Sequence, residues 1–337
     1  MVRDHHDRTQ MAPYLRLTCT CAVVASSGRA NHAIQLPVSH HHQLLSMMHL
    51  SSGQFASGSE SASRRHGAPR EDLGSTPLHF AAAYGRTDEL QRLLRSGADP
   101  RATDHAGATP LHWAAKATCA AAQREETIWL LTTGNADIDA RDGLGDTALH
   151  WAVRTGSAVG VQTLVRAGAN VRLQNDDEEY ALHRVSEIEH PKPGGEIVVT
   201  TDEETDKEAA VCLIVGALCS GGADVDARQL KSRTALHEAA ERRAVFAVGA
   251  LLNAGADVHA RASDGCTPLH YAVRGIGWYN PPSEMPDKAI ASQRASRQIC
   301  QMLVEAGANP DALDGTGRTP LSYATSPGDL EGVLHVR

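Results

Sequence analysis

A four-residue pattern, threonine-proline-leucine-histidine, returns along this chain at a spacing of about 33 residues. The first copy is Thr76-Pro77-Leu78-His79. Six further copies, some with residues changed, begin at positions 109, 147, 180, 234, 267 and 319. A pattern that returns at a fixed spacing predicts small structural units that bury their apolar faces against one another. The chain is therefore expected to form a stack of similar units and not a single globular core.

A second signature, glycine-alanine followed by aspartate or asparagine, precedes the later copies. It begins at Gly97, Gly168, Gly222, Gly255 and Gly307, with the variant Gly134-Asn135-Ala136-Asp137. Small residues follow each tetrapeptide, and apolar residues then recur at helical spacing, as at Leu90, Leu93 and Leu94. Threonine suits a helix N-cap, proline the first helical position, and glycine a residue with positive φ after a helix. Each unit is therefore expected to contain two helices and a short polar turn.

The tetrapeptide and the glycine signature together resemble the ankyrin repeat family, from about Asp72 to the C-terminus. The resemblance implies an all-α repeat solenoid of helix-turn-helix repeats joined by β-turn fingers. We expect an ankyrin repeat domain over residues 71–337. Its six repeats are expected to start near 76, 109, 147, 180, 234 and 267, with a partial C-terminal repeat from 319.

Residues 1–70 are expected to be a disordered low-complexity tail, because they are rich in Ser, His, Gly and Ala and show no sustained periodicity. No acidic residue lies between Arg8 and Ser59, which resembles the composition of an organelle transit peptide. The segment from Leu15 to Ser26 forms no convincing amphipathic helix. Organelle import is therefore a minor alternative.

Repeats two, four and six are longer than the others, and their extra residues are expected between the two helices of the repeat. Repeat four also departs from the pattern at its start. Tyr180 replaces the threonine, and Arg184-Val185 replaces the usual pair of small residues. We therefore expect repeat four to be the least stable part of the stack.

The insert of repeat six contains Trp278 and Tyr279, followed shortly by Pro281-Pro282. Consecutive prolines cannot continue a helix, so this segment is expected to be a loop. Its two aromatic residues have two interpretations. They either pack on neighbouring first helices or stand exposed as anchors for a partner.

Six copies of the tetrapeptide end in histidine. Each histidine belongs to a different repeat, so neighbours are expected to lie on the order of 10 Å apart, whereas zinc needs ligands within about 2.0–2.3 Å of the ion. We therefore favour hydrogen bonding between a helix start and the adjoining loop, and expect no metal site. The residue after this position is aromatic in five of the seven copies. These aromatic residues either pack as core between first helices or form the wall of a partly exposed groove.

The net charge of the chain is −8, and the part after residue 74 has 25 Lys and Arg against 35 Asp and Glu. An acidic solenoid is a poor match for a phosphate backbone, so no nucleic acid partner is expected. No run of about 18 apolar residues predicts a membrane span. Seven scattered cysteines favour reduced thiols inside a cell, and we expect a cytoplasmic or nuclear protein, or one found in both.

The chain contains none of the short motifs that mark nucleophilic hydrolases, phosphate-binding loops, zinc peptidases or paired-cysteine sites. Stacked repeats supply no obvious enclosed pocket. We therefore expect neither catalysis nor a cofactor. The expected function is that of a monomeric scaffold or adaptor that binds one or more proteins. The alternative is a target-recognition subunit of a ligase or signalling complex.

The resemblance implies that partners bind the finger tips and the concave face of the first helices. The matching first-helix positions are Tyr84, Lys116, Arg154, Glu241, Arg242 and Arg274. The matching finger positions are Arg101, His105, Arg141, Leu144, Arg228, Leu230 and Lys231. Trp278 and Tyr279 of the insert complete the candidate set. For each residue the alternative is an ordinary solvated surface side chain.

Overall fold

The computed structural model describes residues 74–117, 119–189, 204–278 and 286–324. All of them belong to the second of the two units into which the chain divides, residues 66–337. Within these ranges the chain forms helices linked by turns, with two isolated β-bridges and no strand. The predicted all-helical repeat fold is confirmed, whereas the predicted tail falls on residues outside those described.

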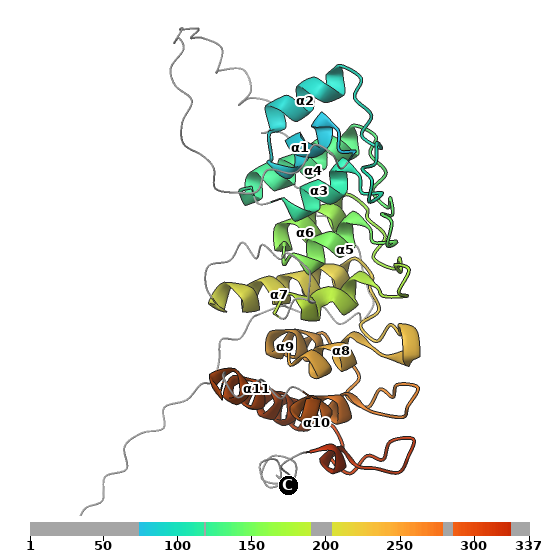
Figure 1. Cartoon of the computed structure of the whole chain (residues 1–337), viewed down its shortest axis with the longest axis vertical. Coiled ribbons are helices and arrows are strands. Elements are labelled where there is room, and N and C mark those ends of the chain that lie inside the picture. Colours follow the sequence, from blue (N-terminus) through green and yellow to red (C-terminus); the bar gives the residue numbers. More distant parts are fainter. Residues whose placement is uncertain (1–73, 118, 190–203, 279–285, 325–337) are drawn as a thin grey trace, which may run out of the picture. The chain divides into compact units, whose positions relative to one another are not determined.

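The helices form two columns, with one helix of each repeat in each column (Figure 1). The first column contains α1 (Pro77–Ala83), α3 (Pro110–Lys116), α5 (Ala148–Arg154), η2 (Ala181–Glu187), α8 (Ala235–Arg242), α10 (Pro268–Trp278) and η4 (Pro320–Tyr323), where η denotes a 3₁₀ helix. The second contains α2 (Thr87–Arg95), α4 (Ala121–Thr133), α6 (Ala158–Arg166), α7 (Glu204–Ser220), α9 (Val245–Asn253) and α11 (Pro286–Glu305). Successive members of each column contact one another, so the apolar core runs continuously from repeat to repeat.

The extra residues of repeats two, four and six partly lengthen the second helices. The helices α4, α7 and α11 are longer than α2, α6 and α9, which have 9 residues each. In repeat six the first helix is also longer than expected. The loop predicted around Trp278 is wrong for that residue, because α10 continues to it. Trp278 lies three positions before Pro281, beyond the residue that proline restricts directly.

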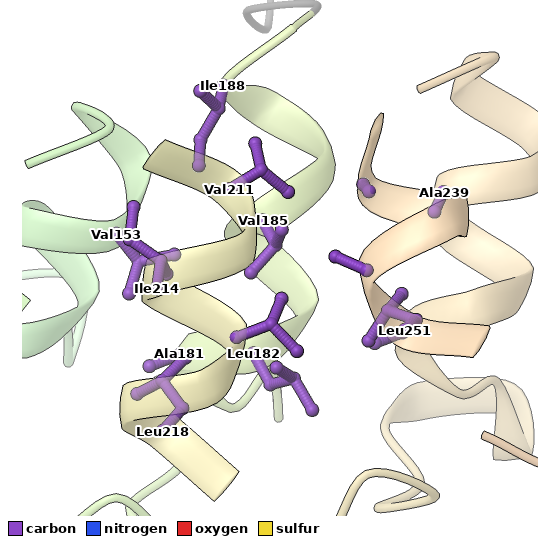
Figure 2. Packing of buried hydrophobic residues seen from close by; sticks show 14 of the residues in the cluster. Val153, Ala181, Leu182, Val185, Ile188, Val211, Ile214, Leu218, Ala239 and Leu251 are labelled. Carbon is purple, nitrogen blue, oxygen red and sulfur yellow. The ribbon is translucent and has the colours of Figure 1, made fainter. Parts of the chain in front are cut away.

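Repeat four has a 3₁₀ first helix, η2, where the other full repeats have an α-helix. Figure 2 shows how this helix is buried: Leu182, Val185 and the following Ile188 lie beside the apolar face of α7, which carries Ile214 and Leu218. All five side chains are at most 2% exposed. The irregular repeat therefore keeps a complete apolar core.

Short fingers connect each repeat to the next. We number each finger by the repeat that follows it: finger two (97–109), three (134–147), four (168–180), five (222–234), six (255–267) and seven (307–319). Each tip is a tight turn, as in finger two, where the Asp104 amide donates to the Ala108 carbonyl at 2.9 Å. Finger five includes a short 3₁₀ turn, η3 (Leu230–Ser232).

One backbone hydrogen bond joins successive finger tips at four of the five junctions. In the first of these, the Gly143 amide donates to the Ala106 carbonyl at 2.7 Å. The other three donors are Asp176, Ser263 and Gly315. Fingers four and five, both within the described residues, have no such bond between their tips. The edge made by the fingers is therefore interrupted between repeats four and five.

Five of the tetrapeptide histidines bridge their own repeat to the next one. In repeat one, Nδ1 of His79 accepts from the backbone N–H of Thr76 at 3.1 Å, and Nε2 donates to the carbonyl of Ala108 at 3.0 Å. The same bonds recur at histidines 112, 150, 237 and 270. The neutral imidazole with its proton on Nε2 satisfies both nitrogens. We call this arrangement the histidine bridge.

The histidine also caps its own helix. The sequence assigned the N-cap to threonine alone, but Thr76 and His79 form a reciprocal capping box in which the imidazole caps the threonine amide. Glutamate usually fills this role at the third helical position. The tetrapeptide therefore needs histidine because the same ring caps one helix and holds the next repeat.

His183 of repeat four lacks the histidine bridge. Neither of its buried ring nitrogens makes a hydrogen bond of regular geometry, although the backbone of Arg233, which matches Ala108 of the bridge, lies near enough to act on the imidazole pKa. Tyr180 stands in place of threonine, and its ring stacks on the imidazole at a centroid distance of 5.7 Å. A buried polar group without a regular hydrogen bond costs stability, so this position weakens the junction with repeat five on the finger side.

Repeat four should open before its neighbours, as the sequence also predicts. We expect the amides of residues 182–185 to exchange faster with deuterated water than those of residues 236–240. Tyr180→Thr should raise the free energy of unfolding by about 1 kcal/mol, because threonine rebuilds the cap with His183. The reverse change in a regular repeat, Thr234→Tyr, should lower it by a similar amount. Equal protection of the two segments, or no gain from Tyr180→Thr, would contradict this prediction.

Stability should also fall on acidification. Burial lowers the pKa of all six histidines, to about 4 for His183 and His237. The unfolded chain, with histidine pKa values near 6.5, then binds more protons than the folded chain. The free energy of unfolding therefore falls as the pH drops from about 6.5 towards about 4. Burial raises the pKa of Glu189 and Glu238, so these two carboxyl groups favour the folded state on acidification. Their effect is opposite to that of the histidines, but two carboxyl groups act against six histidines.

Urea unfolding at a series of pH values measures this dependence. We expect His237→Gln to reduce the slope of the free energy of unfolding against pH by up to about 1.4 kcal/mol per pH unit, because one titrating histidine is removed. His105→Gln is the matched control, since His105 is exposed on a finger tip. The prediction fails if the two variants keep the same slope.

Candidate functional site

The finger tips carry two strongly exposed leucines from the predicted set. Leu144 on finger three is 65% exposed, and Leu230 on finger five is 54% exposed. His105 on finger two and Lys231 on finger five are also exposed. The structure therefore brings these four residues to the same edge of the stack, where a partner could reach them.

Three predicted arginines on the fingers are already engaged within the stack. Arg101 donates to the Asn135 carbonyl at 3.0 Å, and Arg141 pairs with the Asp176 carboxylate at 2.8 Å. Arg228 donates to the Arg261 carbonyl at 2.6 Å. Each guanidinium group therefore ties one finger to the next, and any contact with a partner would add to this structural role.

Two further arginines make the same kind of tie, and the sequence reasoning missed them. Arg172 donates to the Gly222 carbonyl at 2.9 Å, and Arg261 donates to the Leu313 carbonyl at 2.8 Å. Their positions within the repeat match those of Arg101 and Arg228 respectively. An alignment of the repeat sequences, compared position by position, would have identified both arginines.

The predicted first-helix residues differ in their exposure to solvent and in their contacts within the chain. Tyr84 is 41% exposed, and Lys116 is exposed in the last turn of α3. Arg154 and Arg274 lie over the rings of Trp151 and Tyr323, at 5.4 and 5.8 Å from the ring centroids. The first-helix face is thus partly occupied by contacts within the chain.

The aromatic residues after the tetrapeptide pack inside the stack. The edge of the Trp113 ring meets His79 of the preceding repeat, with centroids 5.6 Å apart, and its Nε1 donates to Asp104 at 3.0 Å. The same ring contact recurs at Trp151, Tyr271 and Tyr323. Tyr271 is buried and the other four aromatic side chains are partly buried, so they pack within the stack, while the alternative of a partly exposed groove wall stays a prediction.

Repeats four and five replace this aromatic contact with charged side chains. Arg184 is 5% exposed and lies 3.1 Å from Asp146, 2.7 Å from Glu179 and 3.5 Å from Glu187. Arg184 is therefore surrounded by three carboxylates, which raise the pKa of its guanidinium group against the effect of burial.

The charged contacts continue into repeat five. Arg242, which was predicted as a partner-binding residue, lies 4.0 Å from Glu187 and 3.7 Å from Glu238. Glu238 in turn lies 3.1 Å from Arg233, and Arg233 also pairs with Glu241. We call the set of residues 146, 179, 184, 187, 233, 238, 241 and 242 the ion-pair network. It links three successive repeats, so Glu241 and Arg242 belong to a structural array as well as to the candidate surface.

The buried Arg124 and the partly buried Glu189 each bind the start of the second helix of the next repeat. The carboxylate of Glu189 accepts from the amides of Phe246 and Ala247 at 3.2 and 2.8 Å, so it caps the start of α9 from repeat four. Arg124 of α4 donates to the Ser157 hydroxyl at 2.9 Å, at the start of α6. Neither contact could be recognised from the sequence, because each joins a repeat to the following one across an insert of irregular length.

The insert of repeat six remains a prediction. Trp278 ends α10, and its side chain is not among those described. Tyr279 lies outside the described residues. The two interpretations of this aromatic pair, packing or partner anchor, are therefore both still open.

In the described ranges, no three His, Cys, Asp or Glu side chains are grouped so that they could hold a metal ion. No helix in the described part of the chain is long and apolar enough to cross a membrane.

The paired helices, the capped helix starts and the connecting fingers define a stacked helical repeat protein. A family model described as "Ankyrin repeats (3 copies)" matches residues 59–142, 78–175 and 206–278, which is more than half of the chain. The chain therefore belongs to the ankyrin repeat family.

Relatives match this chain over short segments. It is 52% identical over 44 residues to neurogenic locus notch homolog protein 4 of Homo sapiens, and 46% identical over 50 residues to neurogenic locus Notch protein of Drosophila melanogaster. These segments cover 13% and 15% of this chain and 2% of each relative. The similarity therefore concerns the repeats and not the whole relatives.

Two solved structures match most of the chain. The ankyrin repeat domain of Bcl-3, a member of the IkappaB protein family, aligns with a TM-score of 0.55 at 25% identity and covers 77% of this chain and 98% of that domain. The ankyrin repeat domain of human ASB11 aligns with a TM-score of 0.57 at 21% identity, over 77% of this chain and 96% of that domain. The second likeness shows the fold alone.

The ion-pair network predicts a large cost for removing its central cation. Arg184→Ala should lower the free energy of unfolding by about 3–5 kcal/mol, because two buried carboxylates and one partly buried carboxylate lose their shared partner. The control is Arg86→Ala, which breaks an exposed pair with Glu89 at 3.3 Å and should cost about 0–1 kcal/mol. Urea unfolding followed by circular dichroism measures both. A loss for Arg184→Ala as small as that of the control would rule out a structural role for the network.

Proposed function

We propose that this chain is a non-catalytic scaffold or adaptor that binds partner proteins through its finger tips and first-helix face. The observation that carries this proposal is the exposure of Leu144 and Leu230 on the finger tips. Removing an exposed leucine side chain from water at a contact contributes roughly 1.5–3 kcal/mol. Ankyrin repeat domains are in general protein-protein interaction modules, which supports the same conclusion.

The finer features of this proposal follow from the composition. A net charge of −8 disfavours a nucleic acid partner, so the partner is a protein. We place the chain in the cytoplasm, the nucleus or both, and expect it to act as a monomer. Nothing in the described site resembles a catalytic constellation, so the proposed activity is binding alone.

The second candidate function is a target-recognition subunit of a ligase or signalling complex. In that case, one set of proteins should co-purify constantly as the complex, and a second, variable set should be the targets. A plain scaffold should instead recover its partners without a constant enzymatic assembly. Quantitative mass spectrometry of purified complexes distinguishes the two.

Substituting the finger leucines tests the proposed surface. We expect Leu144→Ala combined with Leu230→Ala to reduce partner recovery at least about tenfold, because each truncated anchor costs about 1 kcal/mol or more. Leu213→Ala is the matched control, since Leu213 is 51% exposed on α7, away from the fingers. Unchanged melting temperatures in all variants confirm that folding is intact. Equal recovery by the finger variant and the control would refute the finger surface.

A further inference from the structure

The finger edge is open at a single place among the described residues, between fingers four and five. The tips there lack the backbone hydrogen bond that joins every other successive pair of tips. His183 also lacks the histidine bridge that the other five tetrapeptide histidines make. Two independent kinds of contact are therefore missing at the same junction.

The helix side of this junction is firmly held. Glu189 caps α9 across it, with carboxylate-to-amide distances of 3.2 and 2.8 Å. Arg242 and Glu187 of the ion-pair network also face each other across it, at 4.0 Å. At the base of the fingers, Arg172 donates to the Gly222 carbonyl at 2.9 Å. These contacts fix the spacing of repeats four and five. The opening between fingers four and five is therefore not the result of weak packing between the two repeats.

The opening contains a groove of about 770 Å³. Ligand sites commonly have volumes of roughly 300–1,000 Å³, so this groove can hold a few side chains of a bound segment. One wall is formed by Tyr180 and Leu182 at the start of repeat four, and the other by residues 223–228 of finger five. Tyr180, the residue that displaces the usual threonine, is thus part of the groove.

The groove combines apolar surface with carboxylates that have a free oxygen. Asp224 and Asp226 both line it. One oxygen of Asp224 accepts from the Asp226 amide at 3.0 Å, and one oxygen of Asp226 accepts from the Asp257 amide at 2.9 Å. Within the described residues neither carboxylate pairs with a cation, so each can accept from a ligand through its second oxygen.

The positive groups of the groove are engaged elsewhere. Arg172 and Arg228 also line it, but Arg172 binds the Gly222 carbonyl, and Arg228 binds the carbonyls of Ser232 and Arg261 at 3.1 and 2.6 Å. The neighbouring tip of finger four exposes Asp176, Asp177 and Glu178. Arg172 and Arg228 keep their charges and balance Asp224 and Asp226, so the surplus negative charge that favours a cation comes from Asp177 and Glu178 on the finger-four tip.

We propose that this groove binds an extended segment of a partner protein that carries a lysine or arginine side chain. The cation lies against the free oxygens of Asp224 and Asp226, and its aliphatic stem packs on Ala223, Ala227 and the Tyr180 ring. An aromatic ring beside a cation adds a further attraction. This inference rests on the proposed function and names the chemistry of one partner contact.

Purified full-length protein and a defined probe test the inference. The probe is a short fluorescein-labelled peptide of alternating lysine and leucine, and the comparison peptide has glutamate in place of lysine. The first variant is Asp224→Asn with Asp226→Asn, which keeps the oxygen that the finger backbone uses. Asparagine is compatible with this turn, because Asn170 and Asn309 occupy the position of Asp224 in fingers four and seven.

The matched control is Asp137→Asn with Asp139→Asn. These residues hold the same positions in finger three, accept the corresponding amide hydrogen bonds and lie outside the groove. Both double variants therefore remove the same charge. The second test variant is Tyr180→Thr, which removes the aromatic ring from the groove wall and should stabilise the fold by restoring the threonine cap.

Fluorescence anisotropy at physiological salt measures the outcome. We expect the lysine peptide to bind, and its affinity to fall at least about fivefold in Asp224→Asn/Asp226→Asn and in Tyr180→Thr. The control should change it by less than about twofold. The inference is overturned if the lysine peptide does not bind, if both double variants lose the same affinity, or if the glutamate peptide binds better. Such a failure, with partner recovery still dependent on Leu144 and Leu230, would leave the proposed function intact.

Discussion

The histidine bridge is the interaction on which the regularity of this stack depends. One buried ring caps its own helix through Nδ1 and holds the carbonyl before the next helix through Nε2. Both bonds require the neutral form, and burial enforces that form by lowering the pKa. The aromatic residue of the next repeat then packs edge-on against the same imidazole. Helix capping, the spacing of successive repeats and the packing of the core therefore all depend on one histidine side chain per repeat.

Repeat four shows what happens when this interaction is lost. Tyr180 removes the threonine cap, His183 stays buried without a hydrogen bond of regular geometry, and the first helix becomes 3₁₀. The chain compensates elsewhere in the repeat: Arg184 pairs with three carboxylates, two of which lie on fingers three and four, and Glu189 caps α9. Buried ion pairs contribute little net stability compared with apolar packing, but they constrain geometry because a displaced charge is costly. The network therefore sets the position of repeats three, four and five more than it strengthens them.

The sequence predicts the fold well because the repeat signal is local. Each helix start has its own threonine and histidine, and each finger follows its own glycine signature, so seven copies reinforce one inference. The same locality limits what the sequence says about the surface. Leu144 and Leu230 could be placed on finger tips, but the engagement of Arg101, Arg141 and Arg228 by neighbouring fingers depends on how successive repeats align. Glu189 and Arg124 were missed for the same reason, since their partners lie in another repeat.

The departures from the repeat pattern are where function is best sought. A residue that follows the pattern is explained by stacking, whereas Tyr180 and Glu178 cost stability where they stand. Glu178, for example, takes φ of 60° at a turn position that glycine fills in fingers two, three, six and seven. A side chain in this left-handed region costs of order 1 kcal/mol relative to glycine. These costs lie on finger four, on one side of the groove between fingers four and five, while the helix side of the same junction is reinforced. A protein that only needed to stack would have no use for this combination, but one that holds a binding groove at a fixed width requires it.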